Sequence, residues 1–437
     1  MNEYLTNQQN KIAVIELKGE PYCQVKGGRE VNCSKTLEIL AINAGYEGTL
    51  SRNLERNRDN LTPLFEGGFY GVDAKIKKGR SLTYSEAFSL MTFVSMGVNK
   101  LVHTKLSPYV KTGSMDPETV FYQSISLLSA MSAKEGFVGL SPDEIAGLTA
   151  ATLEIDTIIR VPAPGNVLGV GGMGGDRGYK RNGGNSKLFS LSTMGAVVAS
   201  NFGYVHKHHS YPNTAKVAGQ SAIEAFGARS DQSNPQSFRF LQENVGLLMS
   251  SCHTTRLIHT LSHRLKGETI NHVVGPLSIP VDRDTTVNAF IGVNDNVHPE
   301  TIIQSLAILQ LKRVQRYSNC VAFCGLNESG AMPEHFNSSL YYANQRAKEA
   351  VAIDEVAPPP FKTLASFLID GRNYGTFIIE PGDFMDNKTL KQINYRKLLV
   401  PNTEEDIILA NRLALTGQDI SKTLYLAMTG ALALFTK

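Results

Sequence analysis

The residues from 165 to 184 have the clearest potential for chemistry. Nine of these twenty residues are glycine, and the apolar run 167–170 leads directly into them. Glycine permits sharp turns and lets several backbone N–H groups converge on one ligand, which is usually phosphate. Basic side chains in the same segment could add charge-assisted hydrogen bonds to a polyanion; they are Arg177, Lys180, Arg181 and Lys187. The segment therefore predicts a phosphate-binding loop, and a solvated surface loop is the alternative.

The spacing of the glycines bears on which phosphate compound binds. Residues 169–174 match the dinucleotide pattern G-x-G-x-x-G. In a dinucleotide fold that pattern opens a helix and is followed by an acidic residue about 20 positions later. Here a polar stretch follows, and no acidic residue lies between Asp176 and Glu224. The Gly-Lys-Ser/Thr ending of a Walker loop is also missing from this stretch. The pattern therefore favours another phosphate ligand.

Histidines and cysteines are the other candidates for chemistry. They are the triplet His206, His208 and His209, the pair His259 and His263, and the pair Cys320 and Cys324. The triplet could bind a metal, but a ligand pocket lined by one of the three is the favoured interpretation. The histidine pair has the spacing of a zinc helix without the glutamate of H-E-x-x-H. The cysteine pair has no second pair and is predicted to lie on a buried strand.

Helix signals dominate from about residue 76 to 155. Thr83-x-x-Glu86 is a capping box ahead of the apolar-periodic run 87–102. Asp116-Pro117-Glu118 predicts a second helix start, because Asp caps, Pro suits the first turn and Glu favours the positive end of the dipole. Ser141-Pro142-x-Glu144 predicts a third helix that runs to about 155. These signals predict a helical domain.

Strand and helix signals alternate after residue 160, which predicts parallel strand pairing. The strands are expected at 166–170, 188–191, 286–293, 320–325 and 376–380. The helices are expected at 195–202, 220–228, 237–251, 299–313, 404–416 and 420–435, with a loop from 206 onward. The predicted fold is α/β, with an N-terminal helical domain and a larger α/β domain built on a mostly parallel central sheet.

Length and composition set the domain count and exclude several classes of protein. A chain of 437 residues exceeds one typical core, so we expect an N-terminal extension of unknown role at 1–75, a helical domain at 76–158 and an α/β domain at 159–437. A net charge of +3 argues against nucleic-acid binding. The sequence contains no run of 18 uncharged apolar residues, so no membrane-spanning helix is expected. Five cysteines without a signal-like N-terminus favour the cytoplasm.

Six motifs in order resemble the anthranilate phosphoribosyltransferase family over roughly 80–437. They are Gly172-Met173-Gly174-Gly175-Asp176 for the family's G-T-G-G-D, Leu188-Phe189-Ser190-Leu191-Ser192-Thr193 for T-F-N-I-S-T, Val205-His206-Lys207-His208 for V-A-K-H, 219–227 for G-S-A-D-V-L-E-A-L-G, Gly275-Pro276-Leu277-Ser278-Ile279-Pro280 for G-P-L-x-N-P, and Cys324-Gly325-Leu326-Asn327-Glu328 for a strand ending in G-L-D-E. Pro381-Gly382-Asp383-Phe384 and Met428–Ala431 also fit in order.

The resemblance implies an enzyme that transfers phosphoribosyl from phosphoribosyl pyrophosphate to a nitrogen of a small aromatic acceptor and releases pyrophosphate. Such enzymes have the two-domain fold described above, use Mg²⁺ and are usually homodimers. The resemblance assigns the donor to Gly172, Gly174, Gly175, Asp176, Ser190, Ser192, Thr193 and Lys207. It names Lys207 and Asp176 as catalytic side chains, and Ser192, Asn327 and Glu328 as magnesium ligands.

Departures from the family pattern gather where the acceptor would bind. The family's K-H-G-N-R reads Lys207-His208-His209-Ser210-Tyr211, and Arg264 could replace an acceptor-binding arginine. His208, Ser210, Tyr211 and Arg264 are therefore the predicted acceptor residues, and the acceptor is anthranilate or a related aromatic compound. Two other functions stay open. One is a nucleoside phosphorylase of related fold, and the other is a relative that binds the donor without turning it over.

Overall fold

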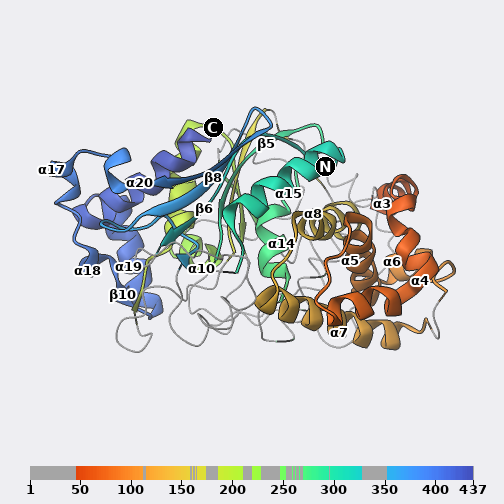
Figure 1. The fold of residues 1–437 in the computed structure, drawn as a ribbon. Helices are drawn as coiled ribbons and strands as arrows, with labels where there is room; N and C mark the ends of the chain where they lie inside the picture. Colours follow the sequence, from red (N-terminus) through yellow and green to blue (C-terminus); the bar gives the residue numbers. More distant parts are fainter. Residues whose placement is uncertain are drawn as a thin grey trace, which may run out of the picture.

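A layer of helices lies beside a large twisted sheet that carries helices on both faces (Figure 1). This arrangement is that of a computed structural model. It describes residues 46–111, 115–157, 160, 163, 165–173, 186–209, 219–227, 247–251, 258, 261, 265, 269–294, 296–326 and 352–436. The fold class expected from the sequence is confirmed, with a helical part followed by an α/β part. Within these ranges the structure contains no candidate membrane-spanning helix.

The helical layer starts earlier in the chain than its sequence signals do. It contains α3 (Tyr46–Arg56), α4 (Arg58–Lys77), α5 (Tyr84–Val98), α6 (Lys100–Leu106), α7 (Pro117–Phe137), α8 (Pro142–Ala151) and the π-helical turn η2 (Thr152–Asp156). The three expected helix starts are confirmed, because Thr83, Asp116 and Ser141 cap α5, α7 and α8 with their side chains. The expected boundary at residue 75 falls inside α4, and the division into domains stays a prediction.

The central sheet has the strand order β4-β3-β1-β5-β6-β8-β9. Its strands are β1 (Val167–Gly172), β3 (Val205–His209), β4 (Leu247–Ser251), β5 (Thr286–Gly292), β6 (Arg316–Leu326), β8 (Thr363–Ile369) and β9 (Arg372–Ile379). The five strands from β4 to β6 pair in parallel, whereas β8 and β9 are antiparallel. The short strand β7 (Ala352–Ile353) pairs antiparallel with the end of β6. The sheet is therefore mostly parallel, as expected.

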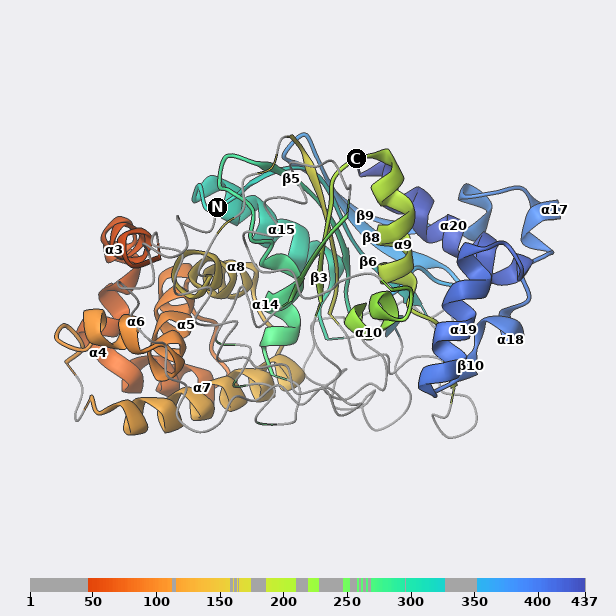
Figure 2. The ribbon, with the colours of Figure 1, turned by 180° about the vertical axis from the view of Figure 1, so that it is seen from behind.

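Each face of the sheet is buried against a different set of helices. Along β5, Val287, Ala289 and Ile291 belong to the core shared with the helical layer, whereas Phe290 belongs to the opposite core. Successive strand residues point to opposite faces. A parallel strand covered on both faces must therefore be apolar at nearly every position. Figure 2 shows α14 and α15 on the face toward the helical layer, with α9 and α20 on the other face.

The helices that cover the sheet fall into two groups. Beside the helical layer lie α14 (Asn271–Leu277) and α15 (Pro299–Leu311). The other group contains α9 (Leu191–Ala199), α10 (Gly219–Glu224), α17 (Asn387–Leu390), α18 (Tyr395–Leu398), α19 (Glu404–Leu415) and α20 (Ile420–Phe435). The 3₁₀ turns η4 (Ser200–Phe202) and η5 (Pro381–Asp383) follow α9 and β9. A separate two-stranded ladder joins β2 (Ser186–Lys187) to β10 (Val400–Pro401).

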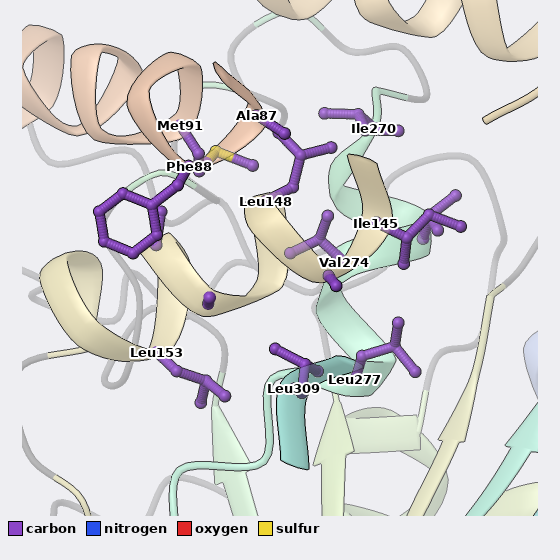
Figure 3. Packing of buried hydrophobic residues seen from close by; sticks show 14 of the residues in the cluster. Ala87, Phe88, Met91, Ile145, Leu148, Leu153, Ile270, Val274, Leu277 and Leu309 are labelled. Atoms are coloured by element: carbon purple, nitrogen blue, oxygen red, sulfur yellow. The ribbon is translucent and has the colours of Figure 1, made fainter. Parts of the chain in front are cut away.

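Helix α8 joins the helical layer to the rest of the molecule. Figure 3 shows Ile145 and Leu148 of α8 between Ala87 and Met91 of α5 on one side and Val274 of α14 on the other. Gly147 permits close contact with α5, since a Cβ there would lie 2.3 Å from the carbonyl oxygen of Tyr84. The two layers therefore share one continuous apolar core.

A buried charge cluster also ties the two layers together. The Glu154 side chain is 1% exposed and pairs with Arg160 and Arg283 at 2.7 and 2.5 Å, and also with Arg56 of α3. Burial alone would raise the pKa of Glu154, but the charges of the three guanidinium groups outweigh burial and lower it. The carboxylate is therefore a fixed charge at the junction of the layers.

Several local expectations are wrong. The segment after residue 204 is the buried strand β3 and not a loop. Residues 188–190 lie in no strand and lead into α9, which begins at Leu191 instead of residue 195. The end of the expected helix 237–251 is β4, while 228–246 lies outside the described residues. Strand β3 is rich in polar residues, and the apolar run 247–249 of β4 fits a helix as well as a strand. Both strands are fixed by pairing with segments that are distant in sequence, which local patterns do not show.

Candidate functional site

The candidate site lies at the point of the sheet where the order in which the chain adds strands reverses. The chain adds β3 and β4 on one side of β1, then returns to add β5 and β6 on the other. In open α/β sheets, ligands bind outside the carboxyl ends of the strands at such a switch point. The last residues of β1 and β5 at that edge are Gly172 and Gly292, which are register partners.

Glycines at the carboxyl ends of three adjacent strands leave room for another segment of the chain. A Cβ at Gly172 would lie 2.9 Å from Asp354 Oδ2, and one at Gly292 would lie 1.9 Å from the Asp354 carbonyl oxygen. On β6, a Cβ at Gly325 would lie 2.8 Å from the Glu355 carbonyl oxygen. Side chains at these positions would displace Asp354 and Glu355, which we call the acidic pair. The glycines therefore seat the acidic pair across the edge of the sheet.

Strand β7 delivers the acidic pair to this edge. It pairs antiparallel with the end of β6, with Gly325 opposite Ile353, and the chain then continues into Asp354 and Glu355. Both residues of the pair are only 8% exposed. Behind them, the fully buried Tyr425 of α20 donates a hydrogen bond from its hydroxyl to the Val356 carbonyl oxygen at 2.5 Å. The main chain that carries the two carboxylates is therefore held on both sides.

The start of α9 brings hydroxyl groups to the same edge. Residues Ser190, Leu191, Ser192 and Thr193, which we call the hydroxyl turn, contain the end of the preceding segment and the first turn of the helix. The Ser192 N–H donates to Glu355 Oε1 at 3.4 Å, and Ser192 Oγ lies 3.9 Å from where a Cβ of Gly172 would be. The hydroxyl turn and the acidic pair therefore meet, although 163 positions separate Ser192 from Glu355.

Lys207 adds a buried cation to this group. It lies on β3 next to β1, and its Nζ donates to Ser192 Oγ at 3.4 Å. The residue is 5% exposed. Burial lowers the pKa of Lys207 to about 8, although the carboxylates of Glu355 and Asp354 act in the opposite direction. A lysine with such a pKa is mostly protonated at neutral pH and partly neutral at pH 8, where added negative charge would favour the ammonium form.

A polar cluster links the helical layer to the carboxyl end of β5. Glu135 of α7 accepts from Asn296 Nδ2 at 3.1 Å, and His272 Nε2 lies 2.9 Å from the same carboxylate oxygen. His272 Nδ1 lies 2.5 Å from the Thr269 carbonyl oxygen, so that nitrogen carries a proton. These contacts hold α7, α14 and the segment after β5 together at the boundary between the layers.

The residues predicted from the sequence divide into two groups. The structure brings Gly172, Ser192, Thr193 and Lys207 together, with Ser190 one residue before α9 and His208 on β3 beside Lys207. Outside the described residues lie Gly174, Gly175, Asp176, Ser210, Tyr211, Arg264, Asn327 and Glu328. Their expected roles stay predictions.

Sequence interpretation missed the acidic pair, which the structure places in the centre of the site. The family pattern at the end of β6 calls for two acidic residues, and Asn327-Glu328 supplies only one. Asp354-Glu355 supplies both, after a β-branched residue and 28 positions beyond Leu326. Two adjacent acidic residues could therefore have been found in the sequence, but they lie far along the chain from the end of β6, where the family pattern has them.

The alternative metal sites find no support in the described part of the chain. No group of three or more His, Cys, Asp or Glu side chains within it could hold a metal ion. Of the histidine triplet, His206 is fully buried on β3, and the side chains of the other two are not described. Cys320 and Cys324 are free thiols buried on β6, as expected. The histidine pair at 259 and 263 lies outside the described residues.

Known proteins similar to this chain are anthranilate phosphoribosyltransferases. One from Lacticaseibacillus paracasei is 29% identical over 197 residues, which are 44% of this chain and 52% of the relative. One from Geobacillus thermodenitrificans is 25% identical over 246 residues, which are 55% of this chain and 61% of that relative. Over these stretches the chain is similar to anthranilate phosphoribosyltransferases. The match spans about half the length of the first of these relatives, and no protein-family model matches the chain.

Solved structures of anthranilate phosphoribosyltransferases share the fold over most of both chains. The enzyme from Saccharomyces cerevisiae in complex with PRPP and Mg superposes with a TM-score of 0.55 at 17% identity, covering 85% of this chain and 89% of the other. The enzyme from Thermus thermophilus gives a TM-score of 0.51 at 17% identity, with 84% and 87% covered. At this identity, the likeness concerns the fold.

Proposed function

We propose that this chain is a phosphoribosyltransferase that transfers the phosphoribosyl group of phosphoribosyl pyrophosphate to a nitrogen of a small aromatic acceptor. The observation that carries the proposal is the meeting of Lys207, the hydroxyl turn and the acidic pair at the switch point of the sheet. Cationic, hydroxyl and carboxylate groups in one place suit a ligand that combines phosphates with a metal ion. The curated relatives carry this activity in their names.

The pyrophosphate group of the donor is assigned to the hydroxyl turn and Lys207. The N-terminal end of a helix favours negative charge, and α9 begins in the hydroxyl turn. Lys207 reaches the same place from β3, as its contact with Ser192 Oγ shows. Gly172 at the end of β1 allows the ligand to approach the backbone closely. Gly174, Gly175 and Asp176, which follow along the chain, are proposed to extend this contact toward the ribose.

The acidic pair suits Mg²⁺. Magnesium prefers oxygen ligands and is usually held by one or two carboxylates together with substrate phosphates. Asp354, Glu355 and the Ser192 hydroxyl are oxygen donors of this kind, and the absence of a Cβ at Gly172 leaves space beside Asp354 Oδ2. We therefore propose the acidic pair and Ser192 as the magnesium site, in place of Asn327 and Glu328. Bound there, the ion would neutralise charge on the pyrophosphate.

The reaction requires little covalent chemistry from the protein. The bond from ribose C1 to the pyrophosphate oxygen breaks, a bond from C1 to the acceptor nitrogen forms, and that nitrogen releases a proton. Negative charge grows on the departing pyrophosphate, so a protonated Lys207 and the amides of the hydroxyl turn would stabilise the transition state. Holding the acceptor nitrogen in line with C1 would supply acceleration through proximity.

The proposal also includes the chemical identity of the acceptor and the residues that bind it. The acceptor is anthranilate or a related aromatic compound, bound by His208, Ser210, Tyr211 and Arg264. Ser210 and Tyr211 stand where the family pattern has Asn and Arg, which favours a related aromatic compound over anthranilate itself. A homodimer remains a further expectation from the family resemblance.

The test is pyrophosphate release from phosphoribosyl pyrophosphate and Mg²⁺ with a panel of acceptors that includes anthranilate, its hydroxylated relatives and common nucleobases. The proposal expects release that depends on one aromatic acceptor. Consumption of inorganic phosphate with a nucleoside would instead establish a phosphorylase. Donor binding without release across the panel would favour a relative that does not turn over, and absence of donor binding would refute the proposal.

The magnesium assignment has its own test in Asp354→Asn. We expect the magnesium concentration for half-maximal release to rise about tenfold or more, because a neutral amide replaces one of two carboxylates. Asp370→Asn is a matched control, since Asp370 lies in the turn between β8 and β9. An unchanged magnesium titration for Asp354→Asn would contradict the assignment.

A further inference from the structure

We infer that Asn411 of α19 is a positioning residue that sets the geometry of the hydroxyl turn for the donor. The Ser190 N–H donates to Asn411 Oδ1 at 2.9 Å, and Asn411 Nδ2 donates to Ser190 Oγ at 3.3 Å. Both the backbone and the side chain of Ser190 are thereby held by one amide group. These two residues are 221 positions apart, so this contact exists only in the folded chain.

The position of Asn411 suits this role. Its side chain is fully buried, and a buried amide in a fixed pair of hydrogen bonds has little freedom to move. The same C-terminal region also holds the chain just before the turn, because Lys187 of β2 is paired with Val400 of β10. The segment that enters α9 is therefore fixed at two points, by β10 and by α19.

The contact with Asn411 also changes how Ser190 can be used. Ser190 occupies the position before α9, where a serine side chain usually accepts from amides of the first helical turn. Within the described structure Ser190 makes no such capping bond, and its Oγ instead accepts from Asn411. Drawing the hydroxyl away from the helix removes one competitor for the positive end of α9, where the Ser192 N–H donates to Glu355 Oε1 and the Leu191 N–H to the Phe189 carbonyl oxygen. Asn411 thus acts on the ligand through Ser190, without touching it.

This inference rests on the proposed function, because it concerns the phosphate end of the donor. Removing the amide should loosen the turn that binds phosphate while leaving the acceptor side unchanged. For Asn411→Ala we expect the Kd and KM for phosphoribosyl pyrophosphate to rise about tenfold, the equivalent of about one hydrogen bond. The KM for the acceptor should change less than about twofold.

A buried asparagine elsewhere separates positioning from simple loss of stability. Asn99 is also fully buried, and it caps α6 by accepting from the N–H groups of Leu101 and Val102. Asn99→Ala should lower the melting temperature without changing donor affinity. Asn411→Asp is the second variant at the site, because it keeps an oxygen for the Ser190 N–H. Its carboxylate should still weaken donor binding by repelling the phosphates.

Calorimetric titration of phosphoribosyl pyrophosphate and of inorganic pyrophosphate, each with Mg²⁺, tests the inference on the full chain. Weaker binding of both ligands by folded Asn411→Ala or Asn411→Asp, with wild-type affinity in Asn99→Ala, would support it. Wild-type affinity in a folded Asn411 variant would overturn this inference and leave the proposed function intact. If the wild-type protein bound neither ligand, the proposed function and this inference would fall together.

Discussion

Proton uptake on donor binding should report directly on Lys207. Burial lowers the pKa of this amine to about 8 in the free protein. A bound pyrophosphate would raise it, because negative charge stabilises the ammonium form. The complex then binds more protons than the free protein, so donor affinity must fall as pH rises through about 8. Below that pH the amine is already protonated, and the affinity should depend little on Lys207.

The size of the effect follows from the pKa. With half of the amines neutral at pH 8, donor binding should take up roughly 0.5 proton there, roughly 0.1 at pH 7 and roughly 0.9 at pH 9. The measurement is calorimetry at each pH in buffers of different ionisation enthalpy. Lys207→Met should abolish this uptake and weaken donor binding by about 2 kcal/mol, or about thirtyfold, through loss of a charge-assisted bond.

An exposed lysine provides the control for this experiment. Lys362 pairs with Glu380 at the surface, so Lys362→Met should keep the wild-type proton uptake. The donor's own phosphate groups can titrate near neutral pH, and their contribution is the uptake that persists in Lys207→Met. If Lys207→Met took up as many protons at pH 8 as the wild type, Lys207 could not be the group that meets the pyrophosphate.

Three further substitutions test the supports of the site. Glu154→Gln should lower the free energy of unfolding by about 3 to 5 kcal/mol in a denaturant titration, because it leaves buried guanidinium groups without their carboxylate. The exposed Glu380→Gln should cost at most about 1 kcal/mol. Equal losses would refute a special role for the buried cluster. Gly172→Ala should fold normally but raise the magnesium requirement of pyrophosphate release, because the new Cβ would displace the end of the Asp354 side chain; a wild-type magnesium titration would count against that contact. Tyr425→Phe should lose about 1 kcal/mol of stability by thermal denaturation and also raise the magnesium requirement; stability loss alone would limit the hydroxyl to a structural role.

Local signals predicted the elements whose stability is local. The capping residues Thr83, Asp116 and Ser141 satisfy backbone groups within three positions of themselves, so the helix starts were visible in the sequence. The apolar strands β1, β5 and β6 were visible because both of their faces are buried. The family resemblance, and not a local signal, placed Gly172 and Ser192 in one predicted site.

The parts that were missed depend on contacts between distant segments. Strand β3 carries two histidines side by side and Lys207, which suggested a solvated loop, yet its pairing with β1 and β4 buries Lys207. The acidic pair reaches the site only because β7 returns along β6. Asn411 contacts Ser190 across more than two hundred positions. Such contacts follow from the topology of the sheet, which local sequence patterns do not encode.

We propose that the pyrophosphate end of the donor binds between Lys207, the hydroxyl turn and the acidic pair. The most direct measurement is a crystal structure of the protein with phosphoribosyl pyrophosphate and Mg²⁺. We expect a phosphate oxygen within hydrogen-bonding distance of Lys207 Nζ and a magnesium ion in contact with Asp354 or Glu355. A donor bound elsewhere on the protein, with these side chains untouched, would contradict it.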